Sequence, residues 1–333
     1  MVTIYPLLYK LKEKYPHAEI LFITFSINKG FLEHNTAVVK IMYVRLTTNI
    51  FHIVQQLISL LIKVRKAKID LVINFETRNN MAALFSFLTG APKRIGLFNR
   101  YEKLLYHSAV FNDTSKHITQ LYSSLTQEID RSIEFQYCDF IGRMGREKEN
   151  VERKLDELNI KTFFCVHPGT SNNFRGKRYK ISYLAELCLL LIRRYHIAIV
   201  YTGSKHDARF IEGMMDLIPE KKLVFNFAGS LGIGEFIELV RKGSLFISND
   251  TGPMHIAASL GINSVVFFGP TSPNRYGPLN KNALIFYKNK PCSPCVGVDY
   301  VNHPCRLGFD CMEFPPQLVF RRITEVFNYD QST

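Results

Sequence analysis

Apolar and polar positions alternate along this chain in two rhythms. Short runs rich in Ile, Val and Phe predict strands, and longer amphipathic runs between them predict helices. In the first half the predicted strands cover residues 18–25, 38–44, 71–75 and 94–98, and the helices cover 7–14, 50–66 and 81–88. In the second half the strands cover 163–167, 197–202, 223–228, 244–248 and 264–268, and the helices cover 181–194, 207–217, 233–241 and 254–260.

This alternation of strand and helix is typical of parallel α/β units. A chain of 333 residues is long for a single core, so we expect two doubly wound parallel sheets in two domains. The charged segment 142–158 is the expected link between them. We predict a first domain at 1–145, a second at 146–315, and a final helix within 316–333 that packs back on the first domain.

The most apolar stretch, residues 50–64, is shorter than the roughly 20 residues that a membrane span needs. It also contains His52, Gln55, Gln56 and Lys63. We therefore interpret it as a helix packed in the core. The alternative is a helix that lies on a membrane surface, which would need a clearer basic face.

Composition narrows the class of partner. The chain has 42 Lys and Arg against 29 Asp and Glu, a formal net charge of +13, which favours a phosphorylated small molecule, a membrane surface or a nucleic acid. No basic-then-apolar signal segment follows Met1, and the seven cysteines are then expected to be reduced thiols in the cytoplasm. Nucleic acid is supported by charge alone, because the sequence has neither an aromatic stripe of the RNA-binding type nor a helix-turn-helix signal.

The first candidate site follows the strand at 163–167. Thr170 and Ser171 come directly after its end, and Lys177 lies a few residues further on. Hydroxyls and backbone N–H groups there would hold phosphate oxygens, and Lys177 would supply a charge to a diphosphate. The residues alone leave open whether this is such a site or a solvated loop.

After the next strand, Ser204 or Asp207 is expected to cap a helix, with a ribose contact as the alternative.

The second candidate site is the stretch SNDTGPMHIAASLG, residues 248–261. Asp250 and Thr251 lie just beyond a strand, Gly252 permits close approach of a ligand, and His255 lies in the first turns of the following helix. A helix N-terminus offers unpaired N–H groups to anions, and a carboxylate accepts from sugar hydroxyls. Taken singly, Asp250 is an ordinary cap and His255 an ordinary packed residue. Together they favour a ligand-binding cup.

This stretch, followed by VFFGPTSPNRYGP at 266–278, resembles the signature of glycosyltransferase family 9, the bacterial heptosyltransferases and their relatives. The family's His-Pro-Gly-x-Ser and Lys-Arg-aromatic motifs are matched at 167–171 and 177–179, with Tyr179 where Trp is usual. The similarity runs over essentially the whole chain.

The resemblance implies a GT-B fold, in which two Rossmann-like domains face each other across a cleft. It implies an inverting glycosyltransferase that needs no metal or other cofactor and moves a hexose or heptose, with ADP-heptose as the expected donor. The acceptor would be a lipopolysaccharide-core or other cell-envelope glycan, with peripheral contact at the cytoplasmic face of the inner membrane. By the same resemblance, Thr170, Ser171 and Lys177 bind the donor diphosphate, and Asp250, Thr251, Gly252 and His255 bind the sugar and phosphates. Leu231, in the loop 229–231, would line the base or ribose pocket, or pack in the core.

Members of this family usually begin with a strand and a Gly-Asp loop that this sequence does not contain. We therefore expect either that Met1 lies inside a longer reading frame, with the first strand and the acidic catalytic base upstream of it, or that the chain is naturally truncated and lacks both. Glu76, just past the strand at 71–75, is the only nearby acid to consider as a substitute, and a cap or an acceptor contact is its alternative role. If the base is absent, the second functional hypothesis is a protein that binds a nucleotide-sugar with little or no turnover.

Four cysteines near the end of the chain, Cys292, Cys295, Cys305 and Cys311, have a C-x2-C-x9-C-x5-C spacing. Four thiolates at such spacing are able to form a structural tetrahedral metal site. The alternatives are reduced thiols in an ordered loop or a disulfide, and the sequence leaves all three open.

Overall fold

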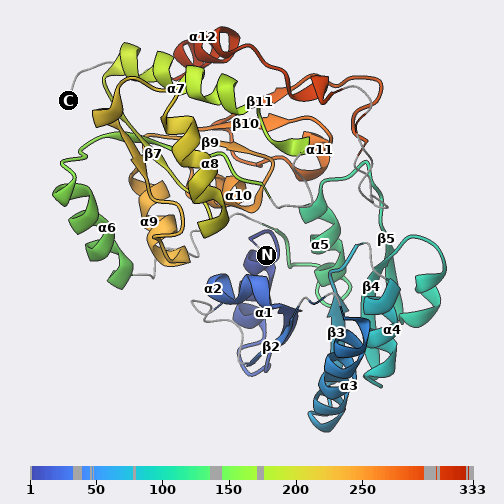
Figure 1. Cartoon of the computed structure of the whole chain (residues 1–333). Helices are drawn as coiled ribbons and strands as arrows, with labels where there is room; N and C mark the ends of the chain where they lie inside the picture. Colours follow the sequence, from blue (N-terminus) through green and yellow to red (C-terminus); the bar gives the residue numbers. More distant parts are fainter. Residues whose placement is uncertain are drawn as a thin grey trace. The chain divides into compact units, whose positions relative to one another are not determined.

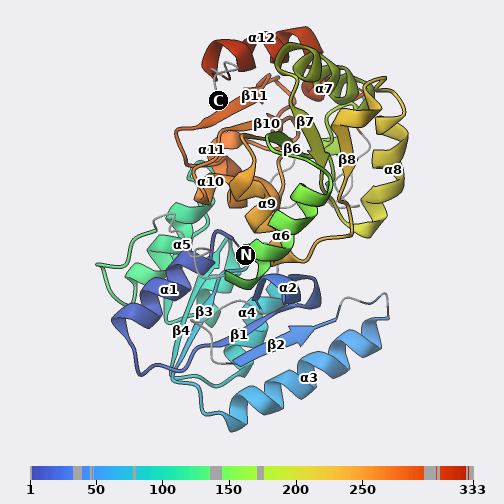
Figure 2. The same cartoon turned by 90° about the vertical axis from the view of Figure 1, so that its left-hand side faces the viewer.

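The structure is a computed structural model that describes residues 2–32, 40–45, 47, 49–77, 80–135, 145–170, 176–295, 305, 308–327 and 329. The chain divides into two compact units, unit 1 (Met1–Tyr137) and unit 2 (Cys138–Thr333), which are described separately (Figures 1 and 2). The charged segment that we expected to link the domains supplies α6 (Gly145–Glu157), a helix of unit 2 that pairs with α9 (Ile233–Lys242) through Lys154 and Glu235 at 3.2 Å.

Unit 2 is built on one six-stranded sheet in which every strand pair is parallel. Five of the six strands were predicted. The sixth, β11, lies at the edge of the sheet and is only partly buried, so it lacks the continuous apolar run of a central strand. The order is β11-β10-β9-β6-β7-β8, and the strands are β6 (Phe163–His167), β7 (Ala198–Tyr201), β8 (Val224–Asn226), β9 (Leu245–Asn249), β10 (Ser264–Phe268) and β11 (Ala283–Tyr287).

Helices cover both faces of this sheet, because successive strand residues point to opposite sides. Phe164 and Val166 belong to the main core with α7 (Ile181–Tyr195), α8 (Lys205–Met215) and α12 (Pro316–Val326). Val266 and Phe268 instead pack with Met254 of α10 (Gly252–Ser259). Figure 1 shows α7 and α12 on one side of the sheet and α9 and α10 on the other. The doubly wound arrangement predicted for the second half is thus confirmed.

The last described helix, α12, packs within unit 2, and its expected packing on the first domain stays a prediction. Val319, Ile323 and Phe327 are buried in the main core of unit 2, where α12 lies against α7. The Gln317 side chain also donates to Glu186 of α7 at 2.5 Å. The apolar face of α7 is what α12 covers, so the final helix completes the core of its own unit.

Unit 1 departs from the single sheet that the alternation predicted. Its described strands form two separate parallel sheets: β1 (Leu21–Phe25) with β2 (Lys40–Val44), and β3 (Leu71–Asn74) with β4 (Lys93–Phe98) and β5 (Ser108–Phe111). Leu7 and Leu11 of α1 (Tyr5–Lys14) pack with Ile20 beside β1 and with Ile73 of β3, so one helix contributes to the core beneath both sheets.

The other described helices of unit 1 are α2 (Lys29–Leu32), α3 (Ile50–Lys66), α4 (Asn80–Leu88) and α5 (Ile118–Gln127). Strand β5 and helix α5 were not predicted, because Ser, Thr and Gln interrupt the apolar pattern of the helix and the strand has only four residues. Short elements complete the described chain: α11 (Pro273–Tyr276) and the 3-10 turns η1 (Ser26–Asn28), η2 (Tyr101–Leu105), η4 (Lys221–Leu223) and η5 (Asp310–Met312).

Helix α3 corrects our interpretation of the most apolar stretch. The helix itself is confirmed, and the Asn49 side chain caps it by accepting from the N–H of Phe51 at 2.9 Å. Only Leu60 and Val64 are buried, however, against β2, and five of its other apolar residues are exposed. The helix is therefore packed along one side only. Among the described helices, none has the length and apolarity that crossing a membrane requires.

The core of unit 2 yields a stability prediction. Phe267 is 1% exposed and its ring stacks on that of Tyr179 at 4.0 Å between centroids. We expect Phe267→Ala to lower the free energy of unfolding by about 3–5 kcal/mol, through lost burial and the cavity it leaves. Leu217→Ala is the control, because Leu217 is 55% exposed and its loss should cost less than about 0.5 kcal/mol. Urea unfolding followed by circular dichroism measures both, and equal losses would contradict the expected packing.

Candidate functional site

The sheet of unit 2 reverses its direction of growth between β6 and β9. From β6 the chain proceeds outward through β7 and β8, whereas from β9 it proceeds the other way through β10 and β11. The two strands are neighbours, with His167 opposite Ser248. Ligands of open α/β sheets bind outside the carboxyl ends of the strands at such a point. Both sites predicted from the sequence, after β6 and after β9, lie here.

Asn249, the last residue of β9, holds these two strand ends together. Its side-chain amide donates to the carbonyl of Pro168 at 2.9 Å, and its side-chain oxygen accepts from the N–H of Tyr179 at 2.8 Å. Asn249 is 2% exposed. Asn249 was not among the predicted site residues, although an Asn that ends an apolar strand is a signal that could have identified it. It fixes the loop after β6 relative to Asp250.

The carboxylate of Asp250 lies at the centre of the site. Lys177 Nζ is 2.6 Å from Asp250 Oδ2, and the Thr271 hydroxyl donates to the same oxygen at 2.5 Å. The side chains of Lys177 and Asp250 are 16% and 8% exposed, so this ion pair is largely shielded from water. The structure thus brings two predicted ligand-binding residues into contact with each other. Thr271, which follows β10 in the sequence GPTS, was quoted in the family signature but was given no role.

The N-terminus of α10 lies directly after this carboxylate. Thr251, and not Asp250, occupies the capping position, and Pro253 lies in the first turn. Gly252 is exposed, and apart from its chain neighbours and its own helix no heavy atom of the described residues lies within 4 Å of where its Cβ would be. The space beside Gly252 is therefore open to a ligand, whereas the N–H of Met254 in this first turn donates to the carbonyl of Thr251 at 3.1 Å. His255 lies one turn into the helix and is partly buried.

Thr170, which follows β6, has a buried hydroxyl with no hydrogen-bond partner among the described residues. A buried polar group without a partner costs about 1–3 kcal/mol, so this position is suited to a ligand oxygen. Ser171, the second hydroxyl predicted here, lies outside the described residues.

The loops after β7 and β8 also meet at this edge of the sheet. Ser204 is the capping residue just before α8, and its N–H and hydroxyl donate to the Asp207 carboxylate at 2.8 and 2.7 Å, which confirms the capping interpretation. Gly229 has a left-handed φ of 73° and donates its N–H to the carbonyl of Gly203 at 2.9 Å. Leu231 is partly buried just before α9, so its predicted contact with a base or ribose stays a prediction.

His167 ends β6 beside these loops. Burial lowers its pKa from 6.5 to about 4, although the nearby Asp207 carboxylate acts in the opposite direction. Its Nδ1 is 3.1 Å from the Thr202 hydroxyl. The imidazole is therefore neutral at neutral pH and does not add a positive charge to the phosphate-binding region.

The cysteine segment supports the loop that carries Thr271. Cys295 donates its N–H to the carbonyl of Pro270 at 3.0 Å, and a Cβ on Gly269 would stand 2.9 Å from the sulfur of Cys311. Burial first, and then the neighbouring thiols, raise the pKa of Cys311. The six described cysteines are all free thiols. In the described part of the chain, no group of three or more His, Cys, Asp or Glu side chains is arranged to hold a metal ion.

Glu76 lies in unit 1, just beyond β3, and its carboxylate accepts from the N–H of Thr77 at 3.0 Å. This is a local turn contact of the kind that the capping alternative describes. Its role as a base stays a prediction.

Three comparisons with known proteins bear on this arrangement. Residues 57–305 match glycosyltransferase family 9 (heptosyltransferase). The chain is 29% identical over 151 residues to lipooligosaccharide heptosyltransferase 2 of Campylobacter jejuni subsp. jejuni serotype O:6, covering 45% of this chain and 47% of that protein. It is 23% identical over 294 residues to lipopolysaccharide heptosyltransferase 3 of Escherichia coli K12, covering 86% and 84%. The chain thus spans about half the length of the first curated relatives it matches.

The structure of E. coli ADP-heptose LPS heptosyltransferase II is similar over 98% of this chain and 94% of that one, with a TM-score of 0.72 and 19% sequence identity. A similarity at this identity concerns the fold. The chain has the α/β GT-B fold, with two parallel-sheet domains, that the resemblance implied.

The partly buried imidazole of His167 gives a prediction about the dependence of stability on pH. A pKa of about 4 in the folded chain, against 6.5 ordinarily, means that the unfolded chain binds the proton more readily. The free energy of unfolding should therefore be highest above pH 6.5 and should fall as the pH drops toward 4. We expect His167→Gln to lose less stability over this interval than the unaltered protein, as measured by urea unfolding at several pH values. His206→Gln, at an exposed position of α8, should keep the original pH dependence. Identical curves for all three proteins would refute the assignment.

Proposed function

We propose that this chain, which belongs to glycosyltransferase family 9, transfers a sugar from a nucleoside diphosphate-sugar to a hydroxyl of a lipopolysaccharide-core or related cell-envelope glycan, with inversion and without a bound metal. We infer that the sugar is heptose and the donor ADP-heptose, because a protein that shares the fold is described as an ADP-heptose heptosyltransferase and the curated relatives are heptosyltransferases. The reaction would take place at the cytoplasmic face of the inner membrane.

The observation that carries this proposal is the group of Lys177, Asp250 and Thr271 beside the N-terminus of α10. A diphosphate needs positive charge, which Lys177 and the positive end of the α10 helix dipole supply. A sugar needs acceptors for its hydroxyls, which the Asp250 carboxylate supplies. Both halves of a nucleotide-sugar thus find complementary groups within one strand-end region.

In the proposed reaction the acceptor oxygen attacks the anomeric carbon on the face opposite the diphosphate. The bond from this carbon to the diphosphate oxygen breaks, its electron pair leaves with the nucleoside diphosphate, and the acceptor proton passes to a base. Negative charge grows on the leaving oxygen, where Lys177 and the N-terminus of α10 stabilise it. We assign no residue of this chain as the base.

The ion pair also predicts how the donor is selected. Before the donor binds, Lys177 is neutralised by Asp250 at 2.6 Å. A diphosphate alone would have to draw Lys177 away and leave its own negative charge near an unsatisfied carboxylate. A nucleotide-sugar avoids this cost, because its sugar hydroxyls donate to Asp250 while the diphosphate takes Lys177. The site therefore favours the intact donor over the nucleoside diphosphate.

Calorimetric titration with ADP and with ADP-heptose tests this division of roles. Lys177→Ala should weaken both ligands by about 10-fold to 100-fold, since each loses a charge-assisted contact to the diphosphate. Asp250→Asn should weaken ADP-heptose by about 10-fold but leave ADP unchanged or tighter, because it removes a repulsive charge as well as a sugar contact.

Lys221→Ala is the matched control, because this lysine is exposed and pairs with Asp216 at 3.6 Å, well away from the strand ends of β6 and β9. If Lys177→Ala binds both ligands like the control, the donor site is wrongly placed. A transfer assay with a lipopolysaccharide-core acceptor then separates the two functional hypotheses. Binding of ADP-heptose without transfer would favour the nucleotide-sugar-binding protein over the enzyme.

A further inference from the structure

Two neighbouring helices of unit 1 expose large apolar side chains. On α3, Ile50, Val54, Ile58 and Ile62 recur every fourth residue, which places them along one side of the helix. Their exposures run from 44% to 63%, and Phe51 beside them is 80% exposed. Helix α4 adds four more exposed residues. The α3–α4 face comprises Ile50, Phe51, Val54, Ile58, Ile62, Met81, Leu84, Phe87 and Leu88.

The two helices form one surface, because Arg65 of α3 donates to the backbone carbonyl of Leu88 at the end of α4, at 2.8 Å. Soluble monomers rarely expose a contiguous apolar patch of more than a few hundred Å². In an ordinary amphipathic helix the outer face is polar. Here Leu60 and Val64 of α3 face the core while Ile58 and Ile62 face outward, so the helix has apolar residues on two opposite sides.

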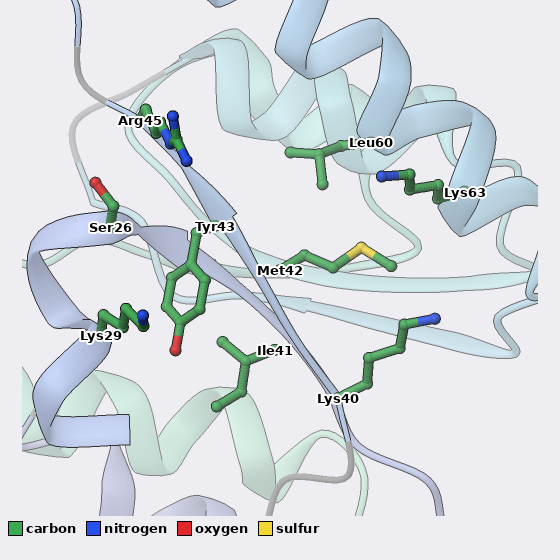
Figure 3. Close-up of a pocket in the computed structure, with 9 residues that line it drawn as sticks. All are labelled: Ser26, Lys29, Lys40, Ile41, Met42, Tyr43, Arg45, Leu60 and Lys63. Atoms are coloured by element: carbon green, nitrogen blue, oxygen red, sulfur yellow. The ribbon is translucent and has the colours of Figure 1, made fainter. Parts of the chain in front are cut away.

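The two helices carry charge of a single sign. Neither α3 nor α4 contains an Asp or a Glu, and the last turn of α3 carries Lys63, Arg65 and Lys66. A recess of about 520 Å³ adjoins α3 at β2, and its lining contains four cations and no carboxylate (Figure 3). Figure 3 shows Lys40 and Lys63 on one side of β2 and Lys29 on the other. The cations of the recess are Lys29, Lys40, Arg45 and Lys63.

Apolar surface flanked by cations matches one kind of partner best. The surface of an anionic bilayer offers acyl chains to the apolar side chains and lipid phosphates to the cations. A second copy of the chain would place the same cations against one another without a carboxylate on either helix to pair them, which is repulsive. A nucleic acid would satisfy the cations but would leave the exposed isoleucines without a favourable contact.

We propose that the α3–α4 face binds the surface of an anionic phospholipid bilayer, with α3 and α4 lying in the interface and the cations of the last turn of α3 reaching lipid phosphates beside it. Long Lys and Arg side chains suit this geometry, since their stems lie along apolar surface while their charges reach the headgroups. The face lies wholly in unit 1 and uses none of the residues proposed to bind the donor. It goes beyond the proposed function because it requires no sugar acceptor in the membrane.

The test is sedimentation of the full chain with vesicles of phosphatidylethanolamine and phosphatidylglycerol, compared with vesicles of phosphatidylcholine alone. We expect binding to the anionic vesicles that falls steeply as salt is added, and at least about 10-fold weaker binding to phosphatidylcholine. Equal binding to both kinds of vesicle, or none to the anionic ones, would overturn the proposal.

Two double variants test separately the apolar and the electrostatic contributions to vesicle binding. Ile58→Ser with Ile62→Ser should weaken vesicle binding by at least about 10-fold through the loss of inserted apolar surface. Both residues are more than half exposed, at 54% and 51%, so the fold should be retained, which circular dichroism checks. Lys63→Gln with Lys66→Gln should weaken it by about fivefold per charge and reduce its dependence on salt.

Leu217→Ser with Lys221→Gln is the matched control, since both residues are exposed in unit 2 and the pair should bind vesicles like the unaltered chain. If the isoleucine variant binds as tightly as this control, the α3–α4 face is not the membrane surface. If sedimentation velocity shows a dimer that only the isoleucine variant disrupts, the face is a self-association surface. A third alternative is that the recess binds free phosphate and not a lipid headgroup. If inorganic phosphate releases the chain completely from the vesicles, the recess is a site for the free anion.

Discussion

The structure of unit 2 is constrained above all by the need to pair one buried carboxylate. Asp250 has a side chain that is 8% exposed, and its partners come from two other loops, Lys177 after β6 and Thr271 after β10. Removing one partner of a buried ion pair typically costs about 3–5 kcal/mol, because the remaining charge is left uncompensated. The three loops that reach the carboxyl ends of β6, β9 and β10 are therefore held in one arrangement, and the N-terminus of α10 lies within it.

That arrangement connects directly to the hydrophobic core. Tyr179, two residues after Lys177, stacks on Phe267 of β10 and donates its hydroxyl to the carbonyl of Phe314 at 2.5 Å. Its backbone N–H is bound by Asn249 at 2.8 Å. Tyr179 thus makes a side-chain hydrogen bond while its ring packs in the core. The charged site and the apolar core are fixed by the same short segment, which explains how a loop between a strand and a helix can hold a lysine in place.

The sequence predicted well the elements whose pattern is set by burial on both sides. Strands β6 and β10 were predicted residue for residue, because a central parallel strand is a continuous apolar run between polar loops. Strand β11 and helix α5 were missed, because partial burial and hydroxyl-bearing residues weaken the pattern. Helix α3 was predicted as a helix but wrongly assigned to the core, since apolar composition does not reveal which side of a helix has a neighbour. At the site, the sequence supplied Lys177 and Asp250, but their contact, and the roles of Asn249 and Thr271, depend on distances between separate loops.

The packing of α12 has a consequence for the order in which the protein becomes stable during synthesis. The hydrogen bond from Tyr179 to Phe314 joins residues 135 positions apart. Ile323 is fully buried in the same core as Phe164 of β6, the first strand of unit 2. A ribosome must therefore release nearly all of unit 2 before α12 can complete the core on the α7 side of the sheet. Unit 1 has its own core, built from residues that emerge earlier, among them Leu7 and Ile133. Until α12 emerges, unit 2 is a nascent segment with exposed apolar strands, the kind of intermediate on which chaperones act.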